Sequence, residues 1–361
     1  MTLSRHLRAL TFVCLTIAAG AAAQPRTDRE LPLVYILATG GTIAGQAATS
    51  TNLTDYKPGL MGDQLVQAVP EIKQFARVRV EQIANISSPD LTFAHWLTLA
   101  KRINAIYTED RSVAGVVITH GTNTIEETGY FLNLTVKHDR PVVMVGSMRP
   151  ATAISADGPL NLLNAVRTAI APESRGKGVL VVLNDEINGA RDVTKTNTYR
   201  VETFKSPELG MLGYVDGDKV VYYRASTKRH TERSEFDVST LTDLPKVEIL
   251  YSYIQPSPAL VKALVADGAR GIVFAGTGAG LISASERDAL APVIALPAES
   301  RPLLVRSNRT GNGRVVGRDD YDKMGFIPAD NLNPQKARIL LMLALTRTRD
   351  RQEILRMFEQ Y

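Results

Sequence analysis

Two threonine-rich turns and one lysine carry the side chains of this sequence that are best suited to covalent chemistry. Thr42 stands in TGGTIAG (Thr39–Gly45), and Thr122 stands in HGTNT (His120–Thr124). A threonine hydroxyl is a poor nucleophile until a neighbour takes its proton or stabilises its anion. Lys195, in DVTKTN, suits that task if its surroundings lower its pKa. These residue types would suit a hydroxyl nucleophile assisted by an amine. Their spacing alone favours the alternative, a surface lysine beside ordinary turn residues.

Other catalytic chemistries find little support in the sequence. The five histidines are scattered and form neither a metal-ligand pattern nor a convincing Ser-His-Asp set. The first glycine turn reads G-G-x-x-x-G, which fits neither a phosphate-binding loop nor a dinucleotide fingerprint, and GTGAGL (Gly276–Leu281) lacks the last glycine of such a fingerprint. A net charge of +5 without a dense basic tract does not favour nucleic-acid binding. We therefore expect no metal, no nucleotide cofactor and no nucleic-acid partner.

Apolar runs precede the polar turns and predict buried strands. These runs are Leu33–Ala38, Val113–His120, Pro141–Ser147 and Gly178–Asn184. Between the last two, GPLNLLNAVRTAI has the 3.6-residue period of a helix. Thr124 and Glu127 have the spacing of a capping box at the start of another helix. Strands buried on both faces and separated by helices indicate a parallel sheet, whose ligands bind beyond the carboxyl ends of the strands. The turns should therefore gather at one edge.

A second run of alternating strands and helices follows a polar stretch near residues 222–242. We expect an N-terminal α/β catalytic domain over residues 24–222, a linker over 223–245 and a C-terminal α/β domain over 246–361. The stretch also fits a loop within one domain. The predicted class is α/β, with a mostly parallel sheet in the larger N-terminal domain.

Residues 1–23 have the order of a secretory signal peptide. A basic start (Met1–Arg8) leads into an apolar run (Ala9–Gly20), and small residues end at Ala23, where we expect cleavage. The run is shorter than the ~20 apolar residues of a membrane anchor. Cys14, the only cysteine, lies inside this segment. We therefore expect an exported protein that has no thiol and no stable membrane anchor.

Five stretches together resemble the bacterial-type L-asparaginases, which include the glutaminase-asparaginases. They are ILATGGTIAG, VITHGTNTIEET, VVMVGSMRPATAISADGPLNL, GARDVTKTNT and LNPQKARILL. The likeness runs from about Leu31 to Tyr361, and the exported, type II (periplasmic) form is the best match. The resemblance implies hydrolysis of the side-chain amide of L-asparagine with release of ammonia, and it leaves open whether L-glutamine is also a substrate. It also implies a two-domain α/β fold, no cofactor, and a homotetramer whose active sites are completed by an adjacent subunit.

The resemblance assigns the catalytic roles. Thr42 matches the threonine that attacks the amide and forms an acyl-enzyme. Tyr56, in LTDYKPG, matches a tyrosine that hydrogen-bonds this threonine. Thr122 matches the second catalytic threonine, and Lys195 matches the lysine that works with it.

Substrate binding is expected at Gly41, Ser88, Thr122 and Asn123. Backbone N–H groups of the glycine turn at Gly41 suit an oxyanion, and Ser88 matches a residue that holds the substrate carboxylate. The family normally has aspartate where this chain has Asn123, and Pro89 replaces another residue that contacts the substrate ammonium. Hydrogen bonds to charged groups are about twice as strong as neutral ones, so we expect substrate binding to weaken by roughly tenfold.

Further departures leave two other interpretations open. In GTGAGL, Ala279 and Leu281 replace asparagines that the family often has, and Asp319 and Asp320 align only loosely with its inter-subunit acidic residue. A periplasmic amino-acid-binding protein also combines a signal peptide with two α/β domains. A catalytically weakened relative of the asparaginases is the other alternative.

Overall fold

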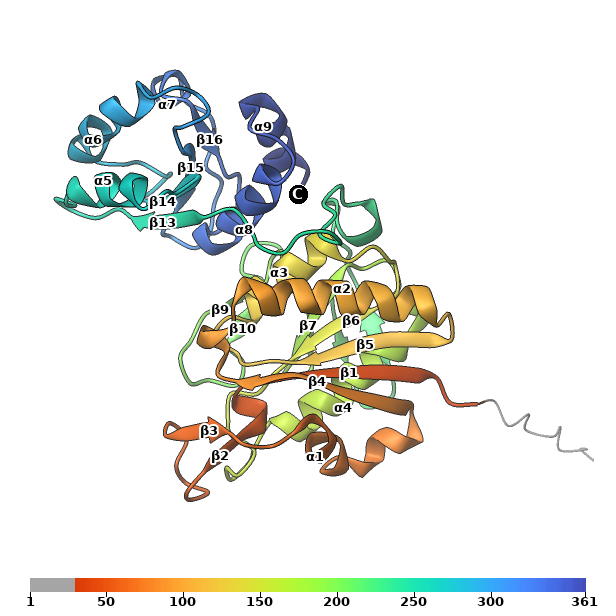
Figure 1. The fold of residues 1–361 in the computed structure, drawn as a ribbon. Helices are drawn as coiled ribbons and strands as arrows, with labels where there is room; N and C mark the ends of the chain where they lie inside the picture. The colour runs from red at the N-terminus through yellow and green to blue at the C-terminus, as the bar shows by residue number, and fades with distance from the viewer. Residues whose placement is uncertain (1–29) are drawn as a thin grey trace, which may run out of the picture. The chain divides into compact units, whose positions relative to one another are not determined.

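The computed structural model describes residues 30–361. Its N-terminal domain is built on an eight-stranded sheet (Figure 1). The predicted signal peptide and Cys14 lie outside the described residues. In spatial order the strands are β12 (Val220–Tyr222), β11 (Gly213–Val215), β8 (Glu186–Gly189), β7 (Val179–Leu183), β6 (Val142–Val145), β5 (Val113–Thr119), β1 (Leu33–Gly40) and β4 (Arg77–Ile86). The five strands from β4 to β7 pair in parallel, and β8, β11 and β12 are antiparallel additions.

The order of the parallel strands creates a switch point between β1 and β5. From β1 the chain moves to β4 on one side and then returns to β5 on the other side. Loops that leave the carboxyl ends of two such strands diverge, and the crevice between them is where doubly wound folds bind ligands. The Thr39 hydroxyl ties the two ends together by donating to the Thr119 carbonyl at 2.9 Å. The two threonine-rich turns follow these strands.

Helices cover both faces of this sheet (Figure 1). α2 (Phe93–Glu109) and α3 (Ile125–Thr135) pack on one face, while α4 (Gly158–Ile170) and the short α1 (Gly62–Gln67) pack on the other. Successive residues of β1 alternate between these two cores: Leu37 belongs to the first and Ile36 to the second, and both are fully buried. Burial on both faces explains why the sequence of β1 is continuously apolar instead of alternating.

Two small hairpins and several single helical turns complete this domain. One hairpin pairs β2 (Gly45–Ala47) with β3 (Tyr56–Pro58), and the other pairs β9 (Thr194–Lys195) with β10 (Phe204–Lys205). Single 3₁₀ turns are η1 (Thr42–Ala44), η2 (Pro70–Gln74), η3 (Ser88–Asp90) and η4 (Pro172–Ser174). The two hairpins place Tyr56 and Lys195.

The C-terminal domain has a smaller, wholly parallel sheet. Its strands run in chain order, as β13 (Val247–Tyr251), β14 (Gly271–Gly276), β15 (Leu303–Asn308) and β16 (Phe326–Pro328). Its helices are α5 (Ala259–Ala266), α6 (Ala284–Ile294), α7 (Asp319–Lys323), α8 (Pro334–Leu345) and α9 (Arg351–Gln360). The predicted fold class, two α/β domains of which the larger has a mostly parallel sheet, is confirmed.

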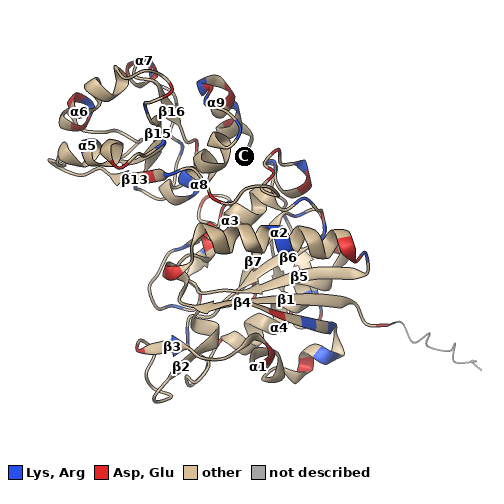
Figure 2. Cartoon of the chain, viewed as in Figure 1, with Lys and Arg blue, Asp and Glu red and all other residues tan. Residues whose placement is uncertain are grey.

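The stretch between the two sheets is more buried than its polar composition suggests. Its one helical turn is η5 (Thr231–Arg233), and both His230 and Phe236 are buried. The domain limits at residues 222 and 246 stay a prediction. Within residues 30–361, no helix is long and apolar enough to cross a membrane. Figure 2 shows acidic and basic residues interspersed over both domains.

Two local expectations from the sequence differ from the structure. Thr124 precedes α3 as expected, but its hydroxyl donates to the Ser88 carbonyl at 2.9 Å and does not cap the helix. The predicted capping box is therefore wrong, because a non-local acceptor competes with the local one. The sequence analysis also missed β4, whose edge position leaves it half-buried and rich in charged residues.

Candidate active site

The turns after β1 and β5 approach each other so closely that both need glycine. Gly41 has a φ of +80°, and a Cβ atom built there would lie 2.2 Å from the Cα atom of Gly121. Glycine alone combines this backbone conformation with the absence of a side chain. Because Thr42 and Thr122 directly follow these two glycines, the contact fixes the positions of both threonines at the switch point.

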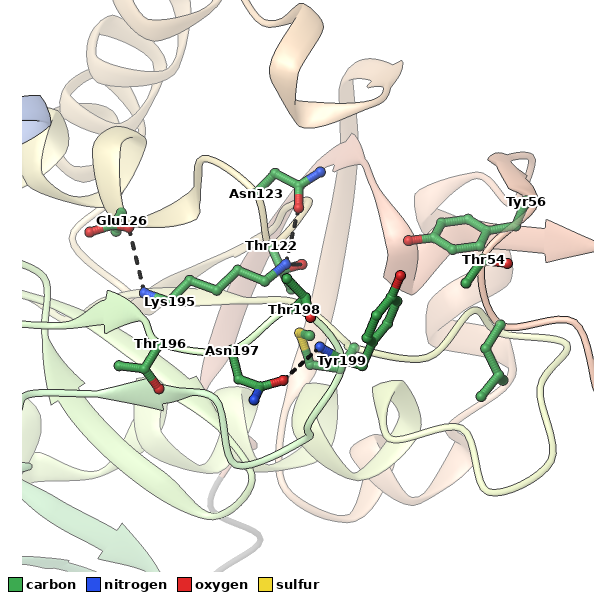
Figure 3. A pocket seen from close by; sticks show the side chains of 12 residues that line it. Thr54, Tyr56, Thr122, Asn123, Glu126, Lys195, Thr196, Asn197, Thr198 and Tyr199 are labelled. Atoms are coloured by element: carbon green, nitrogen blue, oxygen red, sulfur yellow. Dashed lines mark hydrogen bonds between the residues drawn. The ribbon is translucent and has the colours of Figure 1, made fainter. Parts of the chain in front are cut away.

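Thr122, Asn123 and Lys195 form one contact group, as Figure 3 shows. The Lys195 Nζ atom donates to Thr122 Oγ1 at 2.9 Å and to Asn123 Oδ1 at 3.0 Å. Thr122 is buried, and Lys195 is half-buried. Burial lowers the pKa of the Lys195 amine, because desolvation disfavours the charged form. A lysine in this state is suited to exchange a proton with the threonine hydroxyl.

Thr42 and Tyr56 form a second hydroxyl pair. Their oxygen atoms lie 2.8 Å apart, and either group can donate. Thr42 opens η1 and is buried, whereas Tyr56 is carried by the β2–β3 hairpin. The preceding loop, residues 48–55, is largely exposed, so the tyrosine belongs to the outer wall of the site.

A cavity of about 570 Å³ extends from the Thr122–Lys195 pair to Tyr56. Its lining residues are Leu53, Thr54, Tyr56, Thr122, Asn123, Glu126, Met148, Lys195, Thr196, Asn197, Thr198 and Tyr199. Thr42 is not among these residues, and its hydroxyl contacts the lining residue Tyr56. The cavity therefore has the Tyr56 hydroxyl on one side and the amine–hydroxyl pair of Lys195 and Thr122 on the other (Figure 3).

Glu126, which the sequence analysis missed, links this site to the C-terminal domain. Its Oε1 atom accepts from the Thr194 hydroxyl at 3.1 Å and from the backbone N–H of Lys195 at 3.5 Å. Its Oε2 atom accepts from Asn333 Nδ2 at 3.2 Å and lies 3.9 Å from Lys336 Nζ. The carboxylate thus joins the first turn of α3, the strand that carries Lys195, and the start of α8.

Lys336 strengthens that link from inside the protein. Its side chain is buried, and its amine donates to the backbone carbonyls of Arg191 and Val193, just before the Lys195 strand. Burial lowers the pKa of Lys336 to about 8. Asn333 caps α8 by accepting from the Lys336 N–H at 3.1 Å. The sequence signal for this contact group is NPQK at the start of a helix, which does not reveal that the lysine is buried.

His120 holds the second turn and has no free ring nitrogen. Its Nδ1 atom donates to the Gly121 carbonyl at 2.7 Å, so Nε2 accepts from the Thr128 hydroxyl at 2.9 Å. The Thr128 hydroxyl in turn accepts from Trp96 Nε1 at 2.8 Å. Burial lowers the pKa of His120 to about 4, which keeps the ring neutral. This histidine supports the backbone before Thr122.

Ser88 lies beside the glycine contact but lines a different cavity. Its Oγ atom is 2.7 Å from the position of a Cβ built on Gly121 and has no hydrogen-bond partner among the described residues. The second cavity, of about 490 Å³, includes Pro89, Phe93 and Arg338. The role of Ser88 toward a substrate carboxylate stays a prediction. Within residues 30–361, no cluster of three or more His, Cys, Asp or Glu residues suits a metal ion.

Fold and site together define a two-domain α/β protein with two threonine hydroxyls at the switch point of its larger sheet, one bonded to a tyrosine and the other to a lysine. Family models match both parts of the chain: residues 33–228 match the model described as "Asparaginase, N-terminal", and residues 246–358 match the "Glutaminase/Asparaginase C-terminal domain". The chain belongs to the asparaginase family, as the resemblance predicted.

Individual relatives agree over nearly the whole length. "L-asparaginase 2" of Bacillus subtilis is 51% identical over 94% of this chain and 90% of its own. "Probable L-asparaginase periplasmic" of Haemophilus influenzae is 47% identical over 98% of this chain and 99% of its own. A solved structure, "Probable Cytoplasmic L-asparaginase from Campylobacter jejuni", has a TM-score of 0.88 and 48% identity, covering 91% of this chain and all of that one.

Proposed function

We propose that this protein hydrolyses the side-chain amide of L-asparagine, and that of L-glutamine as a second substrate, to the acid and ammonia. The names of its relatives and the description of its C-terminal family model support the substrate class. The single observation that carries the reaction type is the 2.9 Å contact between Lys195 Nζ and the Thr122 hydroxyl at the wall of the cavity.

The proposed reaction has two steps. Thr42 Oγ1 attacks the amide carbon. The C–N bond then breaks, ammonia departs, and the acyl group remains bound to Thr42 as an ester. A water molecule then cleaves this ester, which restores the hydroxyl and releases the acid. Splitting a difficult displacement in this way lowers the barrier of each step. Tyr56 orients the attacking hydroxyl, and backbone N–H groups of the turn at Gly41 stabilise the oxyanion.

The Thr122–Lys195 pair moves the protons in this scheme. The pair takes the proton that the nucleophile loses and delivers it to the departing nitrogen. In the second step it activates the water molecule. The lowered pKa of Lys195 supports this role, because a general base works best when its pKa lies near the working pH.

Export and assembly are part of the same proposal. Residues 1–23 form a signal peptide, cleavage near Ala23 releases the protein into the periplasm, and four copies form a tetramer with shared sites. The periplasmic name of the Haemophilus influenzae relative supports export, while the Campylobacter jejuni structure carries a cytoplasmic name. The mass of protein purified from the periplasm tests cleavage, and light scattering tests the tetramer.

A coupled ammonia assay tests the activity, with L-asparagine and L-glutamine measured side by side. We expect ammonia from the wild type and none above background from Thr42→Ala. Lys195→Met should lower kcat by roughly 10²–10⁴-fold, the usual contribution of general acid–base catalysis. Binding of L-asparagine by wild type without ammonia release would instead identify an amino-acid-binding protein.

A further inference from the structure

A cavity of about 180 Å³ in the C-terminal domain collects arginine side chains. It lies between the end of α6, the segment that leads into β15, the turn before β16 and the start of α9. Three arginines line it, together with Asp350: they are Arg301, Arg349 and Arg351. None of its lining residues lines the active-site cavity. This cavity therefore has no part in the amide hydrolysis proposed above.

The charge of Arg349 is poorly compensated inside the protein. Its Nη2 atom donates to the backbone carbonyl of Arg301 at 2.6 Å and to that of Ala298 at 3.3 Å. Its Nε and Nη1 atoms are buried and have no hydrogen-bond partner among the described residues. It also forms no ion pair with a carboxylate within residues 30–361. Burying charged donors without partners is costly, so this guanidinium favours an anion close by.

Neighbouring cations add to the positive charge at this place. Burial lowers the pKa of Arg349, and Arg270 and Arg301 act in the same direction. The exposed Glu299 carboxylate opposes them with a smaller contribution. Arg301 donates to the Ile294 carbonyl at 3.2 Å and, in the described part of the chain, has no carboxylate partner. Unpaired charges of one sign around a cavity attract a counter-ion.

The carboxylates in and beside the cavity already have partners. The Asp350 Oδ1 atom accepts from the backbone N–H of Glu353 at 2.8 Å and caps α9. The Asp322 Oδ1 atom accepts from Arg351 Nη2 at 2.9 Å. The other two arginines of the cavity are therefore left without a negative partner.

The size and the walls of the cavity suit a small anion. Its volume lies below the roughly 300–1,000 Å³ that is typical of sites for drug-sized ligands. Val293, Ile294 and Leu304 place apolar surface beside the arginines, and charges attract each other more strongly next to apolar walls than in water. Arginine forks match phosphate and carboxylate oxygens. A phosphate group has enough oxygen atoms to accept from two guanidinium groups at once.

We propose that this cavity binds a phosphate group through the guanidinium groups of Arg301 and Arg349. Inorganic phosphate and a small phosphomonoester share this chemistry. The bound group neutralises both arginines and ties the segment before β15 to the start of α9. It takes no part in amide hydrolysis, so this site goes beyond the proposed function and does not depend on it.

Isothermal titration calorimetry of the purified protein with inorganic phosphate tests the site. We expect saturable binding of one phosphate per chain by the wild type. Arg349→Gln and Arg301→Gln should each weaken it by roughly tenfold or more, because each removes a charged donor and keeps a polar side chain. Arg111→Gln is the matched control: it removes the same charge from an exposed turn before β5, in the N-terminal domain, and should leave the dissociation constant unchanged.

Two further measurements use the same proteins. A ligand that binds only the folded state stabilises it, so phosphate should raise the melting temperature of the wild type more than chloride does at equal ionic strength. Glycerol phosphate as a second titrant distinguishes the two sources of the group. Tighter binding of the ester supports a phosphomonoester site, and tighter binding of inorganic phosphate supports a site for the free ion.

Three results would overturn the proposal. The first is the absence of saturable phosphate binding by the wild type. The second is equal affinity in the wild type and both cavity variants, because the ion then binds elsewhere. The third is equal weakening by Arg111→Gln, because the loss then follows net charge alone. If one cavity variant does not fold, the other decides. If neither folds, Arg301→Lys, which keeps the charge but lacks the forked donors, takes their place.

Discussion

The substitution Asn333→Asp lies in the C-terminal domain, but it should impair catalysis because it disturbs the position of Lys195 in the N-terminal domain. Asn333 contributes no atom to the active-site cavity, yet its Nδ2 atom donates to Glu126, and Glu126 holds the backbone of Lys195. The substitution keeps a side-chain oxygen to cap α8, since aspartate is as good a cap as asparagine. It therefore changes the contact with Glu126 and little else.

The expected magnitude follows from the contact distance. The Asn333 Nδ2 atom lies 3.2 Å from Glu126 Oε2. The change removes a hydrogen bond to a charged acceptor, worth ~1.5–3 kcal/mol. It also sets two carboxylates at this separation, where repulsion is roughly 5 kcal/mol for an effective dielectric constant of about 20. Lys336 Nζ, 3.9 Å from the same oxygen, offsets part of this.

We expect the free energy of unfolding to fall by about 2–4 kcal/mol, because the repulsion is partly relieved by the lysine and by proton uptake. Displacing Lys195 by about 1 Å should lower kcat by roughly 10²-fold. Two close carboxylates raise the pKa of one of them. Protonation at lower pH then relieves the repulsion, so the ratio of variant to wild-type kcat should rise as the pH falls.

The assay is ammonia release from L-asparagine over a range of pH, with thermal unfolding measured on the same samples. Asn333→Ser is the matched control, because serine caps the helix and carries no charge. Asn333→Ser should have a somewhat lower kcat than the wild type, but the ratio of its kcat to the wild-type kcat should not rise as the pH falls. An Asn333→Asp protein with wild-type kcat at every pH would refute the idea that this contact positions Lys195.

Three further predictions concern the turns and the outer wall of the site. Gly41→Ala should abolish ammonia release and lower the melting temperature sharply, because its Cβ would collide with the facing turn. Gly176 also has positive φ but has open space around it, so Gly176→Ala should lower the free energy of unfolding by only ~1–2 kcal/mol. His120→Gln should reduce the loss of stability in acid, because between pH 6.5 and the folded pKa of about 4 the wild-type ring binds a proton only when the protein is unfolded. His230, whose pKa burial also lowers to about 4, remains in both proteins, so urea titrations should show a loss about 3 kcal/mol smaller in the variant than in wild type. Tyr56→Phe should lower kcat by ten- to a hundredfold without changing the fold, since it removes only the hydroxyl 2.8 Å from Thr42, and equal kcat values in the ammonia assay would contradict a role in orienting the nucleophile.

The sequence predicts those parts of the fold whose pattern has a local cause. β1 and β5 are continuous apolar runs because helices cover both faces of the sheet, and their polar turns mark where they end. The strand order then brings Thr42 and Thr122 to one edge. β4 was missed because an edge strand is only half-buried and keeps its charges.

Contacts between distant segments explain what the sequence does not predict. A lysine in a helix usually indicates an exposed surface, and nothing local shows that Lys336 is buried against carbonyls 145 and 143 residues away. Glu126 looks like an ordinary residue of a first helical turn until its three hydrogen-bond donors and the Lys336 ammonium are in place. Likewise, the spacing of Ser88 does not reveal that it lines a second cavity.

The junction of β1 and β5 has a consequence for how the protein acquires activity. The bond between Thr39 and Thr119 closes a loop of 80 residues, and the facing glycines meet directly beyond it. Pairing of such remote segments is slow, because the entropy of closing the loop is lost before any contact is gained. During refolding, the helical signal should therefore return before ammonia release does. The time at which ammonia release begins would then measure how fast this long-range pairing forms.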